Sequence, residues 1–485
     1  MCKYTKRSWK IILALAIAIN VIALSGCNLS GAASASTAST TASETTADTS
    51  SSNSIPDKPS GDAPDNGALK GGSKPSGSDK ATIVGTATYE LAGGTASKES
   101  EDIASTEQNK SAVKVSSGGK LTLNNVTMVT KGETESEDES NFYGLNAGVL
   151  AEAGSSININ KSSITTSGSG ANAVFATGTN ANITLTDVTI DTTGDSARGL
   201  DATYKGTVMA TDCTINTKGT HCAAIATDRG EGTINVIGGT MNTAGVDSPA
   251  IYSTGNISVT GATLKATGSE AAVVEGKNSI TLTGANITGS KKNGVMLYQS
   301  ASGDASDGTS SFNMVSGSLT SSEGALFFIT NTNSVVNLNS VKITNATDTL
   351  ISSAADKWGK EGENGGNVAF TASSQTLSGN IICDNVSTVN FTLNNASAYT
   401  GTINGNCAGK EVTVTIDANS TWNVTGDSYI TAFTDSLTGL NNIKDNGHNI
   451  YYDSSNAADK WLDGKTITLS GGGKLTPDKS KGSIT

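Results

Sequence analysis

Arginine, histidine and aromatic residues are scarce in this chain. Apart from Arg7, its arginines are Arg198 and Arg229, and its histidines are His221 and His448. Aromatic residues make up 5% and hydrophobic residues 35% of the 485 positions. So few large apolar side chains exclude a broad globular core, and so few arginines and histidines leave little choice of residues for acid–base catalysis.

Long hydrophobic runs are missing too, with one exception at positions 11–24. Four positive charges and no acid surround this run within the first 26 residues, and the run is shorter than the roughly 20 residues of a membrane span. The pattern predicts a secretory signal peptide over residues 1–26. It ends in Leu24-Ser25-Gly26-Cys27, which resembles the lipobox of bacterial lipoproteins. The resemblance implies that Cys27 carries lipid and anchors the chain to a membrane.

Positive charge is in deficit, because 32 Lys and Arg oppose 44 Asp and Glu, for a formal charge of −12. Removing residues 1–26 takes away four positive charges and no acid, which gives −12 − 4 = −16. Such a surface repels nucleic acid and anionic lipid. Nucleic acid is therefore excluded as an expected partner.

The cysteines show no metal-binding spacing. Four of them follow Cys27, at Cys213, Cys222, Cys383 and Cys407. None forms a C-x-x-C pair, so we expect no zinc site and no other metal centre built on them. Cys383 and Cys407 lie 24 positions apart, about one repeat, and this spacing fits either a disulfide between neighbouring turns or a buried unpaired column.

Residues 27–80, beginning with the lipidated Cys27, contain Ala-Ser-Thr runs and then four prolines among Gly, Ser and Asp. This composition predicts a disordered linker that holds the folded part away from the membrane. The long linker and Asn28 after the lipidated cysteine favour display on the outside of the cell. We therefore expect a lipid-anchored protein of the cell envelope that is exposed extracellularly.

Nine eight-residue segments carry apolar or small residues at offsets 0, 2, 5 and 7. They start at Leu121, Ile157, Ile183, Val208, Ile234, Ile257, Ile280, Phe312 and Val336, most often 23 to 26 positions apart. Offsets 0 and 2 follow the alternation of a strand, and the step from 2 to 5 breaks it by one residue, as a bend between two short strands requires. A further inward strand precedes most copies, for example at Ala173-Val174 and Gly199-Leu200.

Repeats of this length predict an all-β fold, a right-handed parallel β-helix in which coils stack about 4.8 Å apart and place like residues over like. We expect the β-helix over residues 81–400 and terminal coils with a cap over residues 401–485. Insertions at 132–143 and 299–311 fall at turns. The acidic part of the first predicts a solvated loop, with calcium binding as the alternative.

The coil pattern is similar to that of the pectin-lyase-like β-helix superfamily. Ser-Thr-Trp-Asn-Val-Thr-Gly-Asp-Ser at positions 420–428 looks like the terminal coils of autotransporter passenger domains and of adhesin-like clostridial surface lipoproteins. The resemblance covers roughly residues 81 to 475. It implies the fold, and it implies two chemistries: lyases with Arg or Lys beside acid-bound calcium, and hydrolases with two or three Asp and a nearby His.

The best catalytic constellation lies on three successive coils. Arg198, His221, Asp228 and Asp247 are its candidate members, with Asp195, Asp201 and Arg229 beside them. In the register of Leu200 and Ile225, Ser196, His221 and Asp247 are equivalent positions. Such a group can serve acid–base chemistry, and an ordinary solvated turn region is the alternative.

Offset 6 of the nine segments points outward and is mostly threonine, with binding candidates at Thr127, Thr189, Thr214, Thr240 and Thr263. Nine coils extend this ladder over about 40 Å, which suits a polymeric glycan. Threonine also has a high β propensity, so a solvated strand face is the alternative. Four outward aromatics near the turns, Phe175, Tyr204, Tyr252 and Tyr298, share no register for a sugar-stacking platform.

These observations predict a non-catalytic, lipid-anchored, adhesin-like or scaffold protein that presents a rigid surface to glycans or to a host or neighbouring cell. A polysaccharide lyase or glycoside hydrolase acting on acidic polysaccharide is the alternative. No cofactor is expected, apart from calcium if the lyase chemistry applies.

Overall fold

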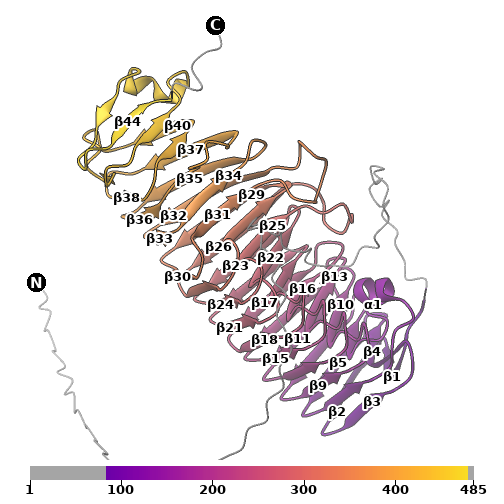
Figure 1. Cartoon of the computed structure of the whole chain (residues 1–485). Coiled ribbons are helices and arrows are strands. Elements are labelled where there is room, and N and C mark those ends of the chain that lie inside the picture. Colours follow the sequence, from indigo (N-terminus) through magenta and orange to yellow (C-terminus); the bar gives the residue numbers. More distant parts are fainter. Residues whose placement is uncertain (1–82, 479–485) are drawn as a thin grey trace, which may run out of the picture. The chain divides into compact units, whose positions relative to one another are not determined.

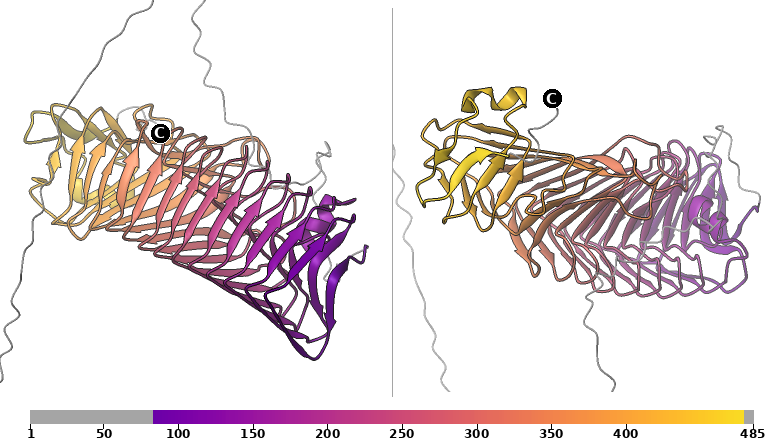
Figure 2. Two further views of the ribbon diagram at one scale, coloured as in Figure 1. Left: turned by 90° about the horizontal axis from the view of Figure 1, so that it is seen from below. Right: turned by 45° about the horizontal axis from the view of Figure 1, so that its top comes forward.

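A computed structural model describes residues 83–478, and the predicted signal peptide, the predicted lipidation site Cys27 and the predicted linker to residue 80 lie outside the described residues. The described part contains 44 strands and two short helices. Its strands pair in parallel from coil to coil, apart from one antiparallel pair near the end of the described region. Figures 1 and 2 show the coils stacked along one axis, which confirms the predicted parallel β-helix.

Three long sheets run along the stack and are called sheets A, B and C after the order of their strands within a coil. Sheet A contains β1 (Thr86–Ala92), β4 (Lys110–Ser116), β7 (Val149–Ala151), β10 (Val174–Thr177), β13 (Leu200–Thr203), β16 (Ile225–Thr227), β19 (Ile251–Ser253), β22 (Ala272–Glu275), β25 (Val295–Tyr298), β28 (Phe327–Thr330), β31 (Thr349–Ser353) and β34 (Asn380–Cys383). The predicted inward strands at Val174 and Leu200 therefore form one continuous sheet.

The nine repeated segments each supply one strand to sheet B and one to sheet C. Sheet B contains β2 (Thr95–Glu99), β5 (Lys120–Asn124), β8 (Ser156–Asn160), β11 (Asn182–Thr186), β14 (Thr207–Thr211), β17 (Thr233–Ile237), β20 (Asn256–Thr260), β23 (Ser279–Thr283), β26 (Thr309–Val315), β29 (Thr332–Asn339), β32 (Gly366–Ser373), β35 (Thr388–Asn394), β37 (Glu411–Ile416) and β40 (Ala432–Asp435). Sheet C contains β3 (Asp102–Ser105), β6 (Thr127–Thr130), β9 (Ser163–Thr166), β12 (Thr189–Thr192), β15 (Thr214–Thr217), β18 (Thr240–Thr243), β21 (Thr263–Ala266), β24 (Asn286–Gly289), β27 (Ser318–Ser321) and β30 (Lys342–Asn345).

In all nine repeated segments, a left-handed residue makes the bend between sheets B and C, and in two of them Gly239 and Gly317 are also left-handed. The bend residue occupies offset 4 of all nine repeated segments, with φ between 47° and 68° at Asn125, Lys161, Asp187, Asp212, Gly238, Gly261, Gly284, Ser316 and Ser340. Asn, Asp and Gly tolerate this conformation best, which explains why they dominate the position. One such residue turns the chain without a loop, so apolar offsets on both sides of the bend face the same interior.

The interior is a set of stacked columns. Leu200 pairs with Ile225 and Ile225 with Ile251, and all three are buried. Hydroxyls at the inward end of sheet C satisfy the backbone of the next turn: Thr192, Thr217 and Thr243 donate to the carbonyls of Ala197, Cys222 and Ser248 at 2.6–2.8 Å. The narrow core is therefore sealed by buried hydrogen bonds where the chain passes from sheet C to sheet A.

The acidic insertion differs from the expected solvated loop. Its second half folds into α1 (Glu137–Tyr143), which Ser136 caps at the N-terminus and Gly144, in the left-handed conformation, caps at the C-terminus. The helix forms because Ser136 accepts a hydrogen bond from the backbone of Glu139, and because Phe142 is buried. Hydrophobic contact thus holds this segment against the coils.

The last coils rearrange into two small sheets. Sheet D contains β33 (Thr376–Ser378), β36 (Ala398–Gly401), β38 (Thr421–Val424) and β41 (Ile443–Lys444). Sheet E contains β39 (Ser428–Ile430), β42 (Ile450–Tyr452), β44 (Lys474–Pro477) and β43 (Ile467–Thr468), and the 3-10 helix η1 (Ala457–Leu462) lies against β40. Neither helix of residues 83–478 has the length and apolarity that a bilayer crossing requires.

Candidate functional site

The predicted hydroxyl ladder is a continuous column on the outer face of sheet C. Coil by coil, the strand register stacks Thr127, Ser163, Thr189, Thr214, Thr240, Thr263, Asn286, Ser318 and Lys342. The five threonines among them are exposed. We call this column the threonine ladder.

The hydroxyls of the five ladder threonines make no hydrogen bond with other residues of the described region 83–478. The neighbouring outward column behaves differently, since Asn242 donates to Asn216 at 3.1 Å and Asn216 donates to Asp191 at 3.0 Å. Amide side chains thus hold one another along the stack, whereas the ladder hydroxyls keep both donor and acceptor capacity for solvent or a ligand.

A shallow hollow of about 280 Å³ lies beside the first rungs of the ladder. Its lining includes the ladder residues Thr127, Ser163 and Thr189 together with the bend residues Asn125, Lys161 and Asp187. The hollow is therefore lined by hydroxyl, amide and charged groups, which suits a hydroxylated ligand better than an apolar one.

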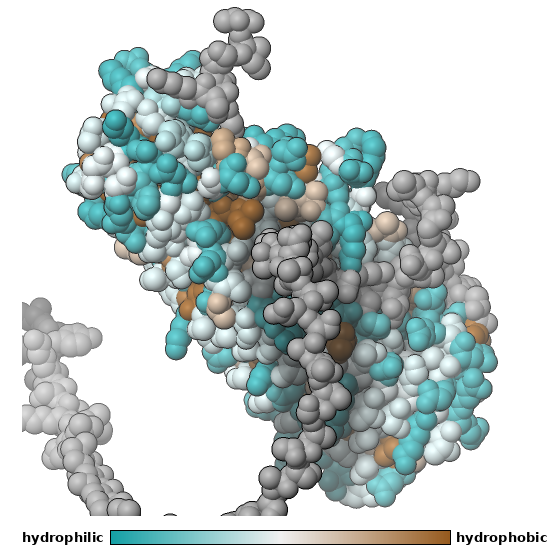
Figure 3. Space-filling model, viewed as in Figure 1, coloured by the Kyte–Doolittle hydropathy of each residue, from teal (hydrophilic) through white to brown (hydrophobic). Residues whose placement is uncertain are grey.

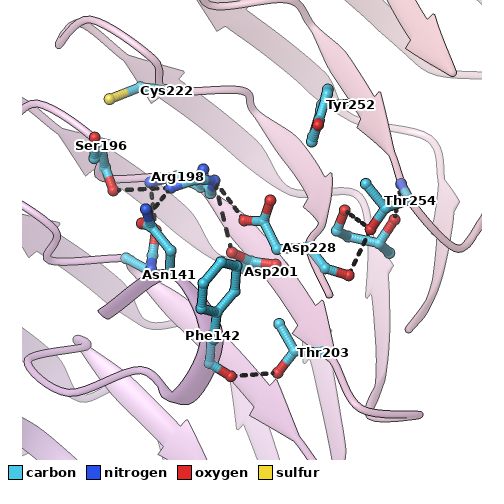
Figure 4. A network of polar contacts seen from close by, with 12 residues as sticks. Asn141, Phe142, Ser196, Arg198, Asp201, Thr203, Cys222, Asp228, Tyr252 and Thr254 are labelled. Carbon is cyan, nitrogen blue, oxygen red and sulfur yellow. Dashed lines mark hydrogen bonds and ion pairs between the residues drawn. The ribbon is translucent and has the colours of Figure 1, made fainter. Parts of the chain in front are cut away.

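Arg198 holds a different kind of site on the outer face of sheet A (Figure 4). Its Nε lies 2.9 Å from Asp228 Oδ2 and 3.7 Å from Asp201 Oδ2. One terminal nitrogen donates to Asn141 Oδ1 at 2.6 Å and to the Ser196 carbonyl at 3.2 Å. We call Arg198, Asp201, Asp228 and Asn141 the arginine cluster, and its three charged residues are all at most 4% exposed.

Burial, with the neighbouring charge of Asp228 second, raises the pKa of Asp201 well above its usual range, and the Arg198 guanidinium opposes this shift less strongly. The protonated form of Asp201 is therefore favoured, and a second carboxyl group, that of Asp228, lies against the same guanidinium. The cluster therefore has the components of acid–base chemistry, enclosed in the protein.

Residues of the insertions cover the arginine cluster and the adjoining part of this face. Thr203 donates to the carbonyl of Phe142 in α1 at 2.9 Å, and the Arg229 guanidinium lies 3.9 Å from the centre of the Phe142 ring. Arg229 also pairs with Asp304 of the second insertion at 2.6 Å. The two insertions are thus bound to the coils, and to each other through Arg229.

A second buried carboxyl, Glu275, secures the second insertion. Its Oε2 accepts hydrogen bonds from the hydroxyls of Tyr252 and Tyr298 at 2.5 and 2.7 Å, and Ser300 donates to its Oε1. Burial raises the pKa of Glu275, and these three hydrogen bonds oppose the rise. This arrangement is typical of a structural anchor, since all three donors are side chains of the protein itself.

The four catalytic candidates fall into two contact pairs. Arg198 contacts Asp228, and His221 lies 3.9 Å from Asp247, which also pairs with Lys292. The predicted register holds, because the backbone of Ser196 bonds to Thr220 and that of His221 to Val246. Their catalytic role stays a prediction.

The four outward aromatics pack against the protein. Phe175 is fully buried, and Tyr204 stacks on Tyr143 of α1 with ring centres 5.4 Å apart. Tyr252 and Tyr298 donate hydrogen bonds to Glu275, and the ring centre of Tyr298 also lies 5.1 Å from that of Trp358. They therefore form no exposed platform, although Phe175 and Tyr252 do lie in one register column of sheet A.

Asn141 and Asp304 were not found by sequence reasoning, because both lie in insertions that carry no repeat register. Asp201 was noticed only as a neighbour, although its position directly after the inward Leu200 marks it as outward-facing. Within residues 83–478, no group of three His, Cys, Asp or Glu side chains is placed to hold a metal ion.

The two cysteines that lie about one repeat apart are in different surroundings. Cys383 is buried and its thiol donates to the Ser387 carbonyl at 3.2 Å, whereas Cys407 is half-buried and its backbone is left-handed, with its sulfur 3.7 Å from Asp478.

Comparison of the chain with protein family models, curated proteins and solved structures gives no match. Evidence for its function therefore comes from its own residues.

Proposed function

We propose that this protein is a lipid-anchored cell-surface β-helix that binds an extended glycan along the threonine ladder, without catalysis. The carrying observation is the column in which five exposed threonine hydroxyls make no hydrogen bonds within the described region. A polymer with regularly spaced hydroxyls can meet one rung after another, because parallel coils repeat at about 4.8 Å. The anchor itself would be the lipid on Cys27.

The surrounding surface supports a polar ligand. Figure 3 shows a largely hydrophilic face with scattered hydrophobic residues. The exposed large hydrophobics of residues 83–478 are spread along the chain: Val84, Met209, Ile237, Val246, Val315, Ile382 and Trp461. A single residue of this kind is ordinary on a protein surface, whereas apolar partners need contiguous patches.

A glycan array probed with the purified chain tests the proposal, followed by titration of the best ligand. The double variant Thr214→Glu and Thr240→Glu places two charges on the ladder, and we expect at least tenfold weaker binding. The matched control places the same substitutions at Thr186 and Thr283, which are exposed on sheet B. We expect the control to bind within about twofold of the parent, since it leaves the ladder unchanged.

An array without any signal above a tag control would reject glycan binding and leave a scaffold role. Equal losses in the ladder variant and the sheet B control would also reject the ladder, because a general effect of added negative charge would then explain both.

Acid–base cleavage of acidic polysaccharide is a second candidate, favoured by Asp201 and Asp228 sharing Arg198. A substrate reaches these buried groups only if α1 moves, which is why binding is preferred. Incubation with polygalacturonate and calcium, with absorbance of unsaturated product and an assay of reducing ends, distinguishes lyase from hydrolase. Activity that Arg198→Ala abolishes would replace the binding proposal with this one.

A further inference from the structure

One of the two long inward columns of sheet B ends in a charged residue on both sides, whereas the other is apolar from Ala96 to Phe433. The column with charged ends runs through offset 2 of sheet B, in register from β2 to β40. This column is Lys98, Leu123, Ile159, Leu185, Ala210, Val236, Val259, Leu282, Met314, Leu338, Ala372, Leu393, Ile416 and Asp435. Lysine and aspartate thus replace the aliphatic residue at the first and last positions.

The N-terminal end of the described stack is open. Each of the strands β1, β2 and β3 is the terminal strand of its sheet and pairs on one side only within residues 83–478. The inward residues Tyr89 and Leu91 are half-buried, whereas their partners one coil later, Val113 and Val115, are fully buried. Free strand edges beside a partly exposed core form a template for pairing with another chain.

Lys98 lies across this open end. Its Nζ is 4.8 Å from the centre of the Tyr89 ring and 3.0 Å from Glu101 Oε2. The aliphatic part of a lysine covers apolar surface while the ammonium group stays near water. Lys98 therefore covers the last apolar layer and places a positive charge where the next aliphatic side chain would stand.

The edge itself carries further protection. Glu90 Oε1 accepts the backbone N–H of Ala87 at 2.8 Å, and the Thr88 hydroxyl donates to the Ala104 carbonyl at 2.8 Å. These two side chains occupy backbone groups of the first coil. Glu99 and Asp102 add exposed negative charge to the outer sides of β2 and β3.

At the opposite end of the stack, the polypeptide chain of the cap covers the last strand of sheet B, in addition to the charged Asp435. The Trp461 indole donates to the Phe433 carbonyl at 3.0 Å, and Asp459 accepts the Phe433 N–H at 2.7 Å, so η1 uses the backbone of β40. Asp435 accepts from the Leu437 backbone at 2.8 Å. A second copy cannot add its first coil there without displacing this cap.

We propose that Lys98 guards the N-terminal end against pairing with the same end of a second copy of this chain. Two open ends brought together would add strand to strand in sheets A, B and C, and would bury Tyr89 and Leu91 of both copies. The same approach brings two Lys98 ammonium groups and the acids of both first coils together in a desolvated interface. The cost of desolvating these charged groups opposes association, while the apolar column behind them favours it.

The test substitutes Lys98→Leu in the full chain and measures protein mass in detergent by size-exclusion chromatography with light scattering. We expect the parent to be a monomer and the variant to double in mass, because leucine continues the column and removes the charge. Hydrogen exchange should then slow in β1, β2 and β3 of the variant. The matched control is Lys120→Leu, an exposed outward lysine on the next strand of the same sheet, which should stay monomeric.

Three outcomes would overturn the proposal: a monomeric Lys98→Leu variant with unchanged circular dichroism, equal association of Lys120→Leu, or association with new protection elsewhere than β1–β3. Should Lys98→Leu lose its β circular dichroism, Lys98→Gln decides the matter. It removes the charge without adding an apolar side chain, so a rise in mass supports the guard and an unchanged monomer contradicts it.

Discussion

The outer faces of sheets A and C belong to the same coils and have opposite chemistry. The five threonines of the threonine ladder on sheet C are uncharged and exposed and make no side-chain hydrogen bonds inside the described region, whereas the arginine cluster on sheet A is charged, buried and bonded to α1. Sequence insertions explain the difference, because both α1 and the Ser300–Asp304 segment contact sheet A. A β-helix can thus leave one face available for recognition while it uses another for its own stability.

The largest effect is expected from removing Arg198. The Arg198→Ala variant leaves Asp201 and Asp228 buried without their cation, which costs about 3–5 kcal/mol of unfolding free energy. Urea unfolding, with hydrogen exchange in β13 and β16, measures the loss. Arg229→Ala is the control, because its side chain is 27% exposed and its loss should cost clearly less. Equal losses would show that the cluster is not the main electrostatic support of this face.

The next largest effect is expected from pH, which should change the local stability of sheet A around Asp201 and not that of sheet C. Because the pKa of folded Asp201 is raised above 3.8, the folded state binds its proton more tightly than the unfolded state. Its contribution to stability is therefore complete below pH about 4 and declines as pH rises through the raised pKa. Exchange protection of β13, corrected for intrinsic rates, should fall over this range and become less pH-dependent in Asp201→Asn. Protection of β12 should not follow the same curve.

Two threonines of one strand provide a finer comparison. Thr217 points inward on β15 and donates to the Cys222 carbonyl, and Thr214 points outward on the ladder. Thr217→Val leaves that buried carbonyl without its donor and should cost about 1–3 kcal/mol. The smallest effect is expected for Thr214→Val, within about 0.5 kcal/mol. Local opening free energies from native-state hydrogen exchange measure both, and a costly Thr214→Val would contradict an unbonded ladder.

The fold was predictable from the sequence because its signal is repeated. Any single segment such as Leu121–Met128 fits several folds, but nine in a regular spacing specify which residues stack. The register of Leu200 over Ile225 and the outward direction of Thr214 were both correct for this reason. Stacking couples distant positions, so one error in spacing would have been visible against the other copies.

The covered face could not be predicted in the same way. The helical half of the acidic insertion has no second copy in the chain, and its one amphipathic turn with Phe142 is too short for a reliable periodicity. The contacts of Asn141 with Arg198 and of Asp304 with Arg229 join segments 57 and 75 positions apart. Local sequence carries no signal for such pairs, and so the arginine cluster was only partly foreseen.

The one-residue bend between sheets B and C restricts how this protein can change in length. Each of the nine copies has its bend residue at the same offset and no extra residue there, whereas both large insertions lie outside these segments. An added residue at the bend would reverse the side-chain direction of the following strand. The ladder can therefore be lengthened only by whole coils, and each coil adds one rung of about 4.8 Å, so its length changes in steps of one turn.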